Sequence, residues 1–120
     1  RSFEKRRIRS KVEIRTQAPM VFIYTTCRDA EEAKKLGELI ISRHLAACVN
    51  FWPIESCYEW EGAMKREKEY AVRVKTNEPK VAEIEDLIVA NHSYEVPFVG
   101  MVDVRRLNRA YKEWMAQVVH

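Results

Sequence analysis

The amino-acid sequence predicts a single α+β domain, in which a four-stranded sheet carries two helices on one face. Three observations lead to this prediction. The chain has 120 residues, which is the size of one domain. Hydrophobic residues make up 47% and charged residues 32%, the balance of an ordinary globular protein. Short runs of β-branched and aromatic residues alternate along the chain with segments of helical period.

A strand and a helix are expected within residues 20–45. Residues 20–26 are rich in β-branched and aromatic side chains and too few for a helix, which is typical of a buried strand. Asp29 can cap the following segment, and Glu31 and Glu32 stand in its first turn, where the helix dipole favours negative charge. Apolar residues then recur at helical spacing, which predicts an amphipathic helix to about Leu45.

Two long strands around a turn at Glu61-Gly62 are expected next. Residues 47–60 form a long extended stretch, in which Pro53 indicates a bulge or an edge strand because proline cannot donate to the ladder. Residues 69–76 alternate between apolar and polar side chains, as a half-exposed antiparallel strand does.

The second half of the chain continues the alternation. Pro79 stands near the first position of a second helix, which should stop near Asn91-His92. Residues 96–104 are expected to form a fourth strand, and apolar residues from Leu107 to Val118 mark a C-terminal helix. The βαββαβ order is that of the ferredoxin-like sandwich, here with an extra closing helix.

The predicted hairpin is too long for the sheet of one subunit. A twelve-residue strand spans about 40 Å, and the outer strands should span about half of that. Part of the hairpin should therefore protrude. Because an unpaired aromatic ribbon is an aggregation hazard, we expect it to pair with a neighbouring subunit in a closed ring; a hairpin folded over its own core is the alternative. The residues expected in this interface are Tyr58, Trp60, Gly62 and Tyr70.

Several short motifs follow one another in the order and spacing of one protein family. They are Y-T-T at 24–26, L-A-A-C-V-N at 45–50, Y-E-W-E-G at 58–62, H-S-Y-E-V-P at 92–97 and Y-K-E-W at 111–114. Through them, residues 20–115 resemble the CutA1 divalent-cation-tolerance family. The resemblance implies a ferredoxin-like subunit, a very stable homotrimer similar to that of the PII signalling proteins, and a role in the response to divalent metal ions. It suggests metal binding, signalling or scaffolding rather than catalysis.

The same resemblance directs attention to a metal site. Some family members are proposed to bind copper through a cysteine near the end of the first strand and two adjacent histidines. The matching positions here hold Thr25, Asn91 and His92, and Cys27 lies two residues on, on the same strand face. A divalent cation such as copper at His92 and Cys27 is one hypothesis. The alternative is a structural role for His92, at the C-terminal end of its helix.

Polar and aromatic residues near the hairpin are candidates for an intersubunit cleft. The cleft candidates are Glu59, Glu67, Lys75, Tyr94 and Trp114. Carboxylates around the turn could hold a hard cation, but interleaved basic residues favour solvated salt bridges. Because the family trimer is similar to that of the PII proteins, a PII-like sensor that binds small molecules in intersubunit clefts is an alternative function, although the sequence shows no phosphate-cradling loop.

Other function classes find less support. The sequence contains no hydrolase triad, Gly-rich phosphate loop or paired catalytic carboxylates, so we predict no enzymatic activity and no obligatory cofactor. An RNA-binding RRM shares the βαββαβ order, but residues 69–76 lack its glycine and paired aromatics, so nucleic acid is not an expected partner.

Charge and cysteine patterns complete the expectations. Residues 1–18 hold seven basic and two acidic side chains, and we expect them to form a flexible basic extension to a domain at 19–120. No apolar run reaches the roughly 18 residues that span a membrane. The three cysteines form no C-x-x-C motif, so we expect free thiols and a cytoplasmic location.

Overall fold

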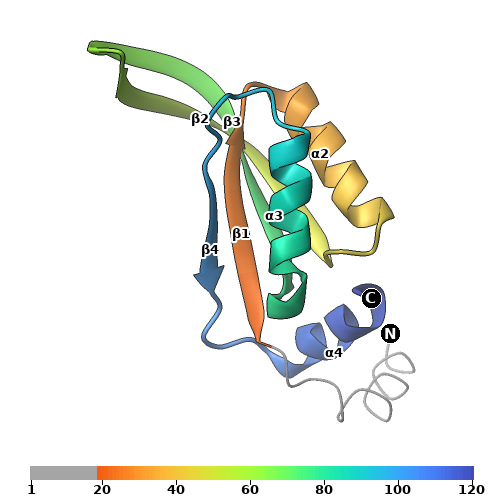
Figure 1. The fold of residues 1–120 in the computed structure, drawn as a ribbon. Coiled ribbons are helices and arrows are strands. Elements are labelled where there is room, and N and C mark those ends of the chain that lie inside the picture. Colours follow the sequence, from red (N-terminus) through yellow and green to blue (C-terminus); the bar gives the residue numbers. More distant parts are fainter. Residues whose placement is uncertain (1–18) are drawn as a thin grey trace.

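The computed structural model describes residues 19–120 and has the predicted ferredoxin-like architecture (Figure 1). The basic extension predicted at 1–18 lies outside the described residues. Four strands form one antiparallel sheet in the order β2-β3-β1-β4. The strands are β1 (Met20–Cys27), β2 (Cys48–Trp60), β3 (Ala63–Asn77) and β4 (Val99–Asp103).

Helices cover one face of the sheet and close one end of it. The helices are α2 (Ala30–Ser42), α3 (Val81–Ala90), preceded by the 3₁₀ turn η1 (Glu78–Lys80), and α4 (Arg109–Val118). α2 and α3 lie side by side on the same face, and α4 sits near the start of β1 (Figure 1). Within residues 19–120, no helix is long and apolar enough to cross a membrane.

The main core lies between the sheet and the two helices α2 and α3. Alternate residues of β1 and β3 point toward the helices, as the two-residue period of a strand requires. The apolar stripes of the helices face them at spacings of three and four residues. The buried side chains include Ile23, Val72, Val74, Leu36, Ile40, Ile84 and Ile88.

α2 begins where the sequence predicted and ends earlier. The Asp29 carboxylate accepts the backbone N–H of Glu32 at 2.9 Å, which caps the helix. The helix stops at Ser42 rather than Leu45, because His44 adopts a left-handed backbone conformation with φ of 59°. Leu45 is nevertheless buried, and its N–H bonds back to the carbonyl of Ile40.

β2 and β3 form one uninterrupted hairpin. They pair from Cys48↔Lys75 to Trp60↔Ala63 without an extra residue, so the bulge considered at Pro53 is absent. The other expectation for this proline is met, because β2 is an edge strand of the sheet. Glu61 and Gly62 both have positive φ, at 53° and 81°, which makes the two-residue turn that matches strand twist.

The hairpin projects beyond the sheet, as predicted. β1 pairs only with residues 70–77 of β3, so residues 54–60 and 63–69 pair only with each other within the described chain. We call residues 54–69 the hairpin arm. The arm extends away from the body (Figure 1), and the molecule measures 56 × 25 × 22 Å along its principal axes.

β4 is shorter than predicted. It covers residues 99–103, whereas residues 96–98 belong to the loop that follows α3. Pro97 cannot donate to a ladder, which is consistent with a later strand start. The fourth strand therefore begins three residues later than predicted, and the loop before it is correspondingly longer than predicted.

The sheet face opposite α2 and α3 carries aromatic side chains. The Arg73 guanidinium lies 5.1 Å from the ring centre of Phe22 and 5.2 Å from that of Trp52. Tyr24 contacts both Trp52 and Phe98, with ring centres 6.3 Å apart in each case. α4 packs near Phe22 at one end, so the described chain leaves much of this open face, including Phe98, uncovered.

Candidate functional site

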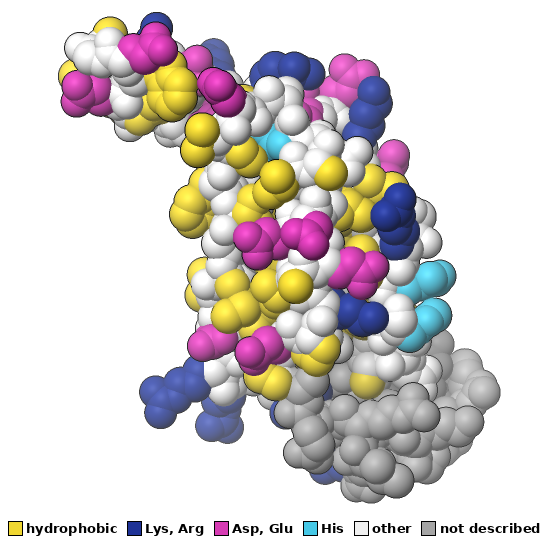
Figure 2. All heavy atoms as spheres, in the orientation of Figure 1, with side chains coloured by type: hydrophobic (Ala, Val, Ile, Leu, Met, Phe, Trp, Pro, Cys, Tyr) yellow, Lys and Arg dark blue, Asp and Glu magenta, His cyan; other side chains and the backbone are white. Residues whose placement is uncertain are grey.

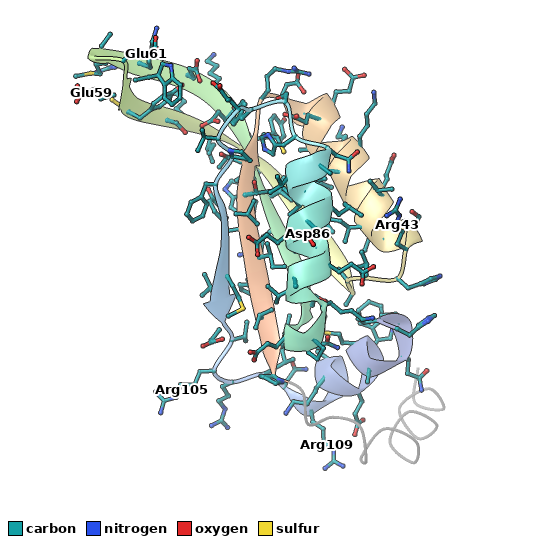
Figure 3. The ribbon with its side chains drawn as sticks, in the orientation of Figure 1. Arg43, Glu59, Glu61, Asp86, Arg105 and Arg109 are labelled. Atoms are coloured by element: carbon teal, nitrogen blue, oxygen red, sulfur yellow. The ribbon has the colours of Figure 1, made fainter. Side chains whose placement is uncertain are left out.

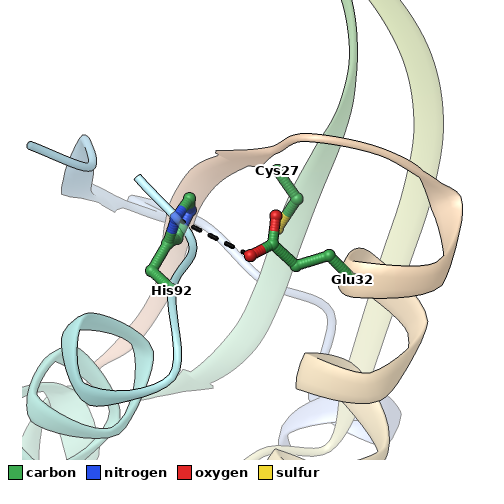
Figure 4. Close-up of side chains that lie close together, drawn as sticks. All are labelled: Cys27, Glu32 and His92. Atoms are coloured by element: carbon green, nitrogen blue, oxygen red, sulfur yellow. Dashed lines mark ion pairs between the residues drawn. The ribbon is translucent and has the colours of Figure 1, made fainter. Parts of the chain in front are cut away.

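Three side chains able to ligate a metal meet where β1 ends (Figure 4). Cys27 is the last residue of β1, Glu32 lies in the first turn of α2, and His92 follows α3. One ligand atom from each lies within 4.8 Å of the others. The sequence had suggested Cys27 and His92 as partners but not Glu32. Its only signal was the spacing of Asp29 and Glu32, which is that of a capping box.

His92 is a fully buried imidazole with both ring nitrogens engaged. Its Nδ1 accepts the backbone N–H of Tyr94 at 3.0 Å, so the proton must be on Nε2. Nε2 donates that proton to the carbonyl of Thr26 at 2.8 Å. The histidine therefore fastens the loop after α3 to the end of β1.

Glu32 ties the same loop to α2. Its carboxylate accepts the backbone N–H of Arg28 at 2.8 Å and that of Ser93 at 2.7 Å. Burial alone would raise the pKa of Glu32, but these hydrogen bonds outweigh it and hold the pKa below its ordinary value. The carboxylate is thus an ionised anchor, and its side chain is only 10% exposed.

The Cys27 thiol is buried and strongly protonated. Burial is the main reason that its pKa rises to about 12, and the carboxylates of Glu32, Asp29 and Glu69 raise it further. At pH 7 the thiol is therefore almost entirely protonated. Because the thiolate is the form that ligates metals and attacks electrophiles, Cys27 is inert in this setting.

The donor set does not fit a bound ion in this arrangement. A metal would have to displace the Tyr94 N–H from His92 and the N–H groups of Arg28 and Ser93 from Glu32. It would also have to remove the proton from a thiol whose pKa is about 12. Through these hydrogen bonds His92 and Glu32 hold β1, α2 and the loop after α3 together, and the Cys27 side chain is buried beside them. We call Cys27, Glu32 and His92 the latch.

A second contact extends the latch to the hairpin arm. The Tyr94 hydroxyl donates to the Glu69 carboxylate, which is almost buried at the base of the arm. Burial and this hydrogen bond raise the pKa of Tyr94 well above its ordinary value. The loop after α3 therefore connects the end of β1 to the point where the arm leaves the sheet.

The residues predicted for an interface lie on the arm or at its base. The Tyr58 hydroxyl donates to the Glu67 carboxylate at 2.7 Å, across the two strands of the arm. Trp60 and Gly62 lie at the tip, whereas Tyr70 packs partly against the main core. The tip also carries Glu59 and Glu61, both labelled in Figure 3.

The cleft candidates do not form one site within the chain. Glu59 and Glu67 are on the arm, and Tyr94 is on the loop that bonds to its base. Lys75 and Trp114 lie at the other end of the sheet, around Tyr111: the Lys75 ammonium is 5.5 Å from that ring centre and Trp114 is 5.4 Å from it.

A hollow of about 500 Å³ lies at the base of the arm. Residues 28–30 at the start of α2 form one wall, and residues 53–55 and 68–70 of the two strands form the other. Its lining includes Arg28, Lys68, Glu55 and Glu69, so charges of both signs meet there. The hollow is open to solvent, and sequence reasoning did not anticipate it.

Comparison with known proteins places these features in one family. Residues 21–118 match the family described as CutA1 divalent ion tolerance protein. A relative from Archaeoglobus fulgidus, named divalent-cation tolerance protein CutA, is 37% identical over 98 residues, which cover 82% of this chain and 96% of that protein. The rice protein CutA 1, chloroplastic, is 39% identical, over 83% of this chain and 57% of its own length.

Solved structures show the same fold. The structure described as a periplasmic divalent cation tolerance protein CutA from Archaeoglobus fulgidus superimposes with a TM-score of 0.82 at 36% identity, covering 84% of this chain and 99% of that one. CutA1 from Oryza sativa superimposes with a TM-score of 0.84 at 37% identity, covering 88% and 97%.

Proposed function

Since this chain belongs to the CutA1 divalent ion tolerance family, we propose that it acts in the tolerance of divalent cations, copper among them, as a non-enzymatic homotrimer. Its relatives are named for this tolerance. The observation that carries the assembly is the hairpin arm, whose strands lack outer partners within the described chain.

The arm offers both backbone groups and apolar surface to another copy. Residues 54–60 and 63–69 of its two strands pair with neither β1 nor β4. Tyr58, Trp60 and Met64 are 40%, 44% and 72% exposed on it. An edge of this kind is a template for a strand from another chain, and a second copy of the same chain satisfies every arm when the ring closes.

The open sheet face adds a second surface for the same partners. Phe98 and Val102 are 61% and 55% exposed on it, and Trp114 of α4 is 40% exposed. Burying such side chains stabilises association by about 25 cal/mol for each Å² removed from water. The ring number of three is taken from the family resemblance, and the arm and open face supply the contacts.

Native mass spectrometry tests the assembly. The expected mass is three times the chain mass of 14.2 kDa. The double variant Trp60→Lys/Met64→Lys on the arm should give single chains, because it places two charges in the buried contact. The control is Val89→Lys on α3, which is 52% exposed and lies away from the arm. A wild-type mass of one chain would refute the proposal.

The latch residues are not expected to bind copper, because hydrogen bonds within the protein already engage the nitrogens of His92 and the carboxylate of Glu32. We therefore expect copper(II) calorimetry to give the same heats for wild type and Cys27→Ala. If Cys27→Ala loses a binding heat that the wild type shows, copper binds at the latch and the purely structural role of the latch is rejected.

A small-molecule sensor is the second candidate function, because the hollow at the base of the arm is the kind of concave site that ligands use. Arg28 and Lys68 could meet an anionic group there. In a thermal-shift screen, a nucleoside phosphate that binds there should raise the Tm of wild type but not that of Lys68→Ala. If no compound raises the wild-type Tm, this function is unsupported.

We also propose a reducing compartment such as the cytoplasm. Cys27, Cys48 and Cys57 are all unpaired, and free thiols persist where glutathione and thioredoxin keep them reduced. Cell fractionation with thiol labelling of the endogenous protein tests this location, because it reports both the compartment and the state of the cysteines. Recovery from an oxidising compartment with Cys57 in a mixed disulfide would contradict it.

A further inference from the structure

Two histidines that are far apart in sequence stack on each other at the surface. The rings of His44 and His120 have centres 4.4 Å apart and planes inclined by only 18°. Both side chains are exposed, and a pair of histidine side chains lies side by side at the surface in Figure 2. The latch and the hairpin arm use neither residue.

The backbone holds the two residues in place. The N–H of His120 donates to the carbonyl of His44 at 3.0 Å. Each histidine is also next to an anchored residue: His44 precedes Leu45, and His120 follows Val119. Leu45 is buried and its carbonyl accepts the Thr76 hydroxyl at 2.6 Å, and Val119 is buried and bonds to the carbonyl of Met115. These contacts place the two imidazoles next to each other.

The chemistry of the pair is that of a small chelate. Neutral imidazole is the commonest protein ligand for transition metals, and it suits zinc, copper and nickel. A metal–imidazole bond is about 2.0–2.1 Å long, so two imidazoles sharing an ion need donor nitrogens within about 4 Å of each other. The ring centres are 4.4 Å apart, so side-chain rotations that open the stack can bring one donor nitrogen of each ring within this distance and turn both lone pairs toward one ion.

The pair differs from the latch in the hydrogen bonding of its ring nitrogens. In the latch, both nitrogens of His92 are engaged in hydrogen bonds inside the protein. His44 and His120 contact each other through their ring faces, and within the described residues their ring nitrogens make no hydrogen bond. An ion in solution can therefore reach this pair without unfolding any element.

We propose that His44 and His120 form a surface site for a borderline divalent transition-metal ion, with water completing its coordination. The site goes beyond the proposed function and does not depend on the trimer, because both ligands come from one chain. Loss of assembly and loss of this site can therefore be observed separately.

Nickel(II) titration of the full chain by calorimetry tests the proposal, because nickel favours imidazole whereas zinc also favours thiolates. Wild type should bind one nickel ion per chain. His44→Asn and His120→Asn should each weaken binding at least about tenfold, since the second ligand acts at a high effective concentration. Asparagine also tolerates the left-handed backbone of His44.

Imidazole NMR of the wild type identifies the ligands without any variant. The chain has only three histidines, so nickel should broaden the signals of two and spare the third, that of buried His92. The proposal would be overturned by broadening of His92 first, or by equal affinity in wild type and the double variant His44→Asn/His120→Asn. Dependence on one of the two histidines alone would also overturn it.

Discussion

Removing the Glu32 carboxylate tests the latch most directly. This carboxylate accepts two backbone N–H groups, from Arg28 and Ser93, and is only 10% exposed. Hydrogen bonds to a charged group contribute about 1.5–3 kcal/mol each. We expect Glu32→Ala to lower the free energy of unfolding by about 3 kcal/mol and Glu32→Gln by about 1.5 kcal/mol, because glutamine keeps an acceptor without the charge.

The effect should depend on pH in a defined direction. The pKa of Glu32 is held below its ordinary value of 4.5 in the folded protein. A depressed folded pKa stabilises the protein above pH 4.5, and that contribution is lost as the pH falls through the folded value. The difference in the free energy of unfolding between wild type and Glu32→Gln should therefore be largest at pH 7 and shrink steadily below about pH 4.5.

Urea unfolding at one protein concentration measures both effects, since the stability of an oligomer depends on concentration. The matched control is Glu31→Gln, one residue away on the same helix turn. Glu31 is 76% exposed and pairs with Lys35 at 3.8 Å, so its loss should change stability by no more than about 0.5 kcal/mol. Equal losses in the two glutamine variants, or a pH-independent difference, would refute the role given to Glu32.

Three further predictions concern neighbouring groups. Tyr94→Phe should cost about 1–3 kcal/mol in urea unfolding, because it leaves the almost buried Glu69 carboxylate without its hydroxyl donor; an unchanged midpoint would contradict this contact. Iodoacetamide at pH 8 should leave buried Cys27, whose pKa is about 12, unmodified until denaturant is added; peptide mapping by mass spectrometry that finds Cys27 labelled in the native protein would reject the burial argument. Gly62→Ala should cost about 1 kcal/mol, because φ of 81° strains an L-residue although nothing crowds the added Cβ; a stabilised variant would mean that the turn has another conformation.

Local patterns were sufficient for most of the fold. The period of residues 20–26, the cap at Asp29 and the turn at Glu61-Gly62 are properties of neighbouring residues, and the structure confirms each of them. The excess length of the hairpin also followed from strand lengths alone. Errors arose at the ends of elements, as at Leu45 and at the start of β4, because a cap or a proline there acts over one or two residues.

The sites depended on tertiary structure. Sequence reasoning put Cys27 beside His92, but the arrival of Glu32 and the occupation of the imidazole nitrogens follow from the packing of α2 and the loop after α3. The pKa of Cys27 is likewise set by burial and by three carboxylates, two at the start of α2 and one on β3.

The amino-acid sequence by itself therefore determined the order of elements, the protruding hairpin and the family, because periodicity, turn chemistry and motif spacing are carried by nearby residues. Only the tertiary structure decided which donors meet. His44 and His120, for example, are joined through a single backbone hydrogen bond between the end of α2 and the end of α4. Contacts of this kind depend on how whole elements pack, and no local pattern in the chain encodes them.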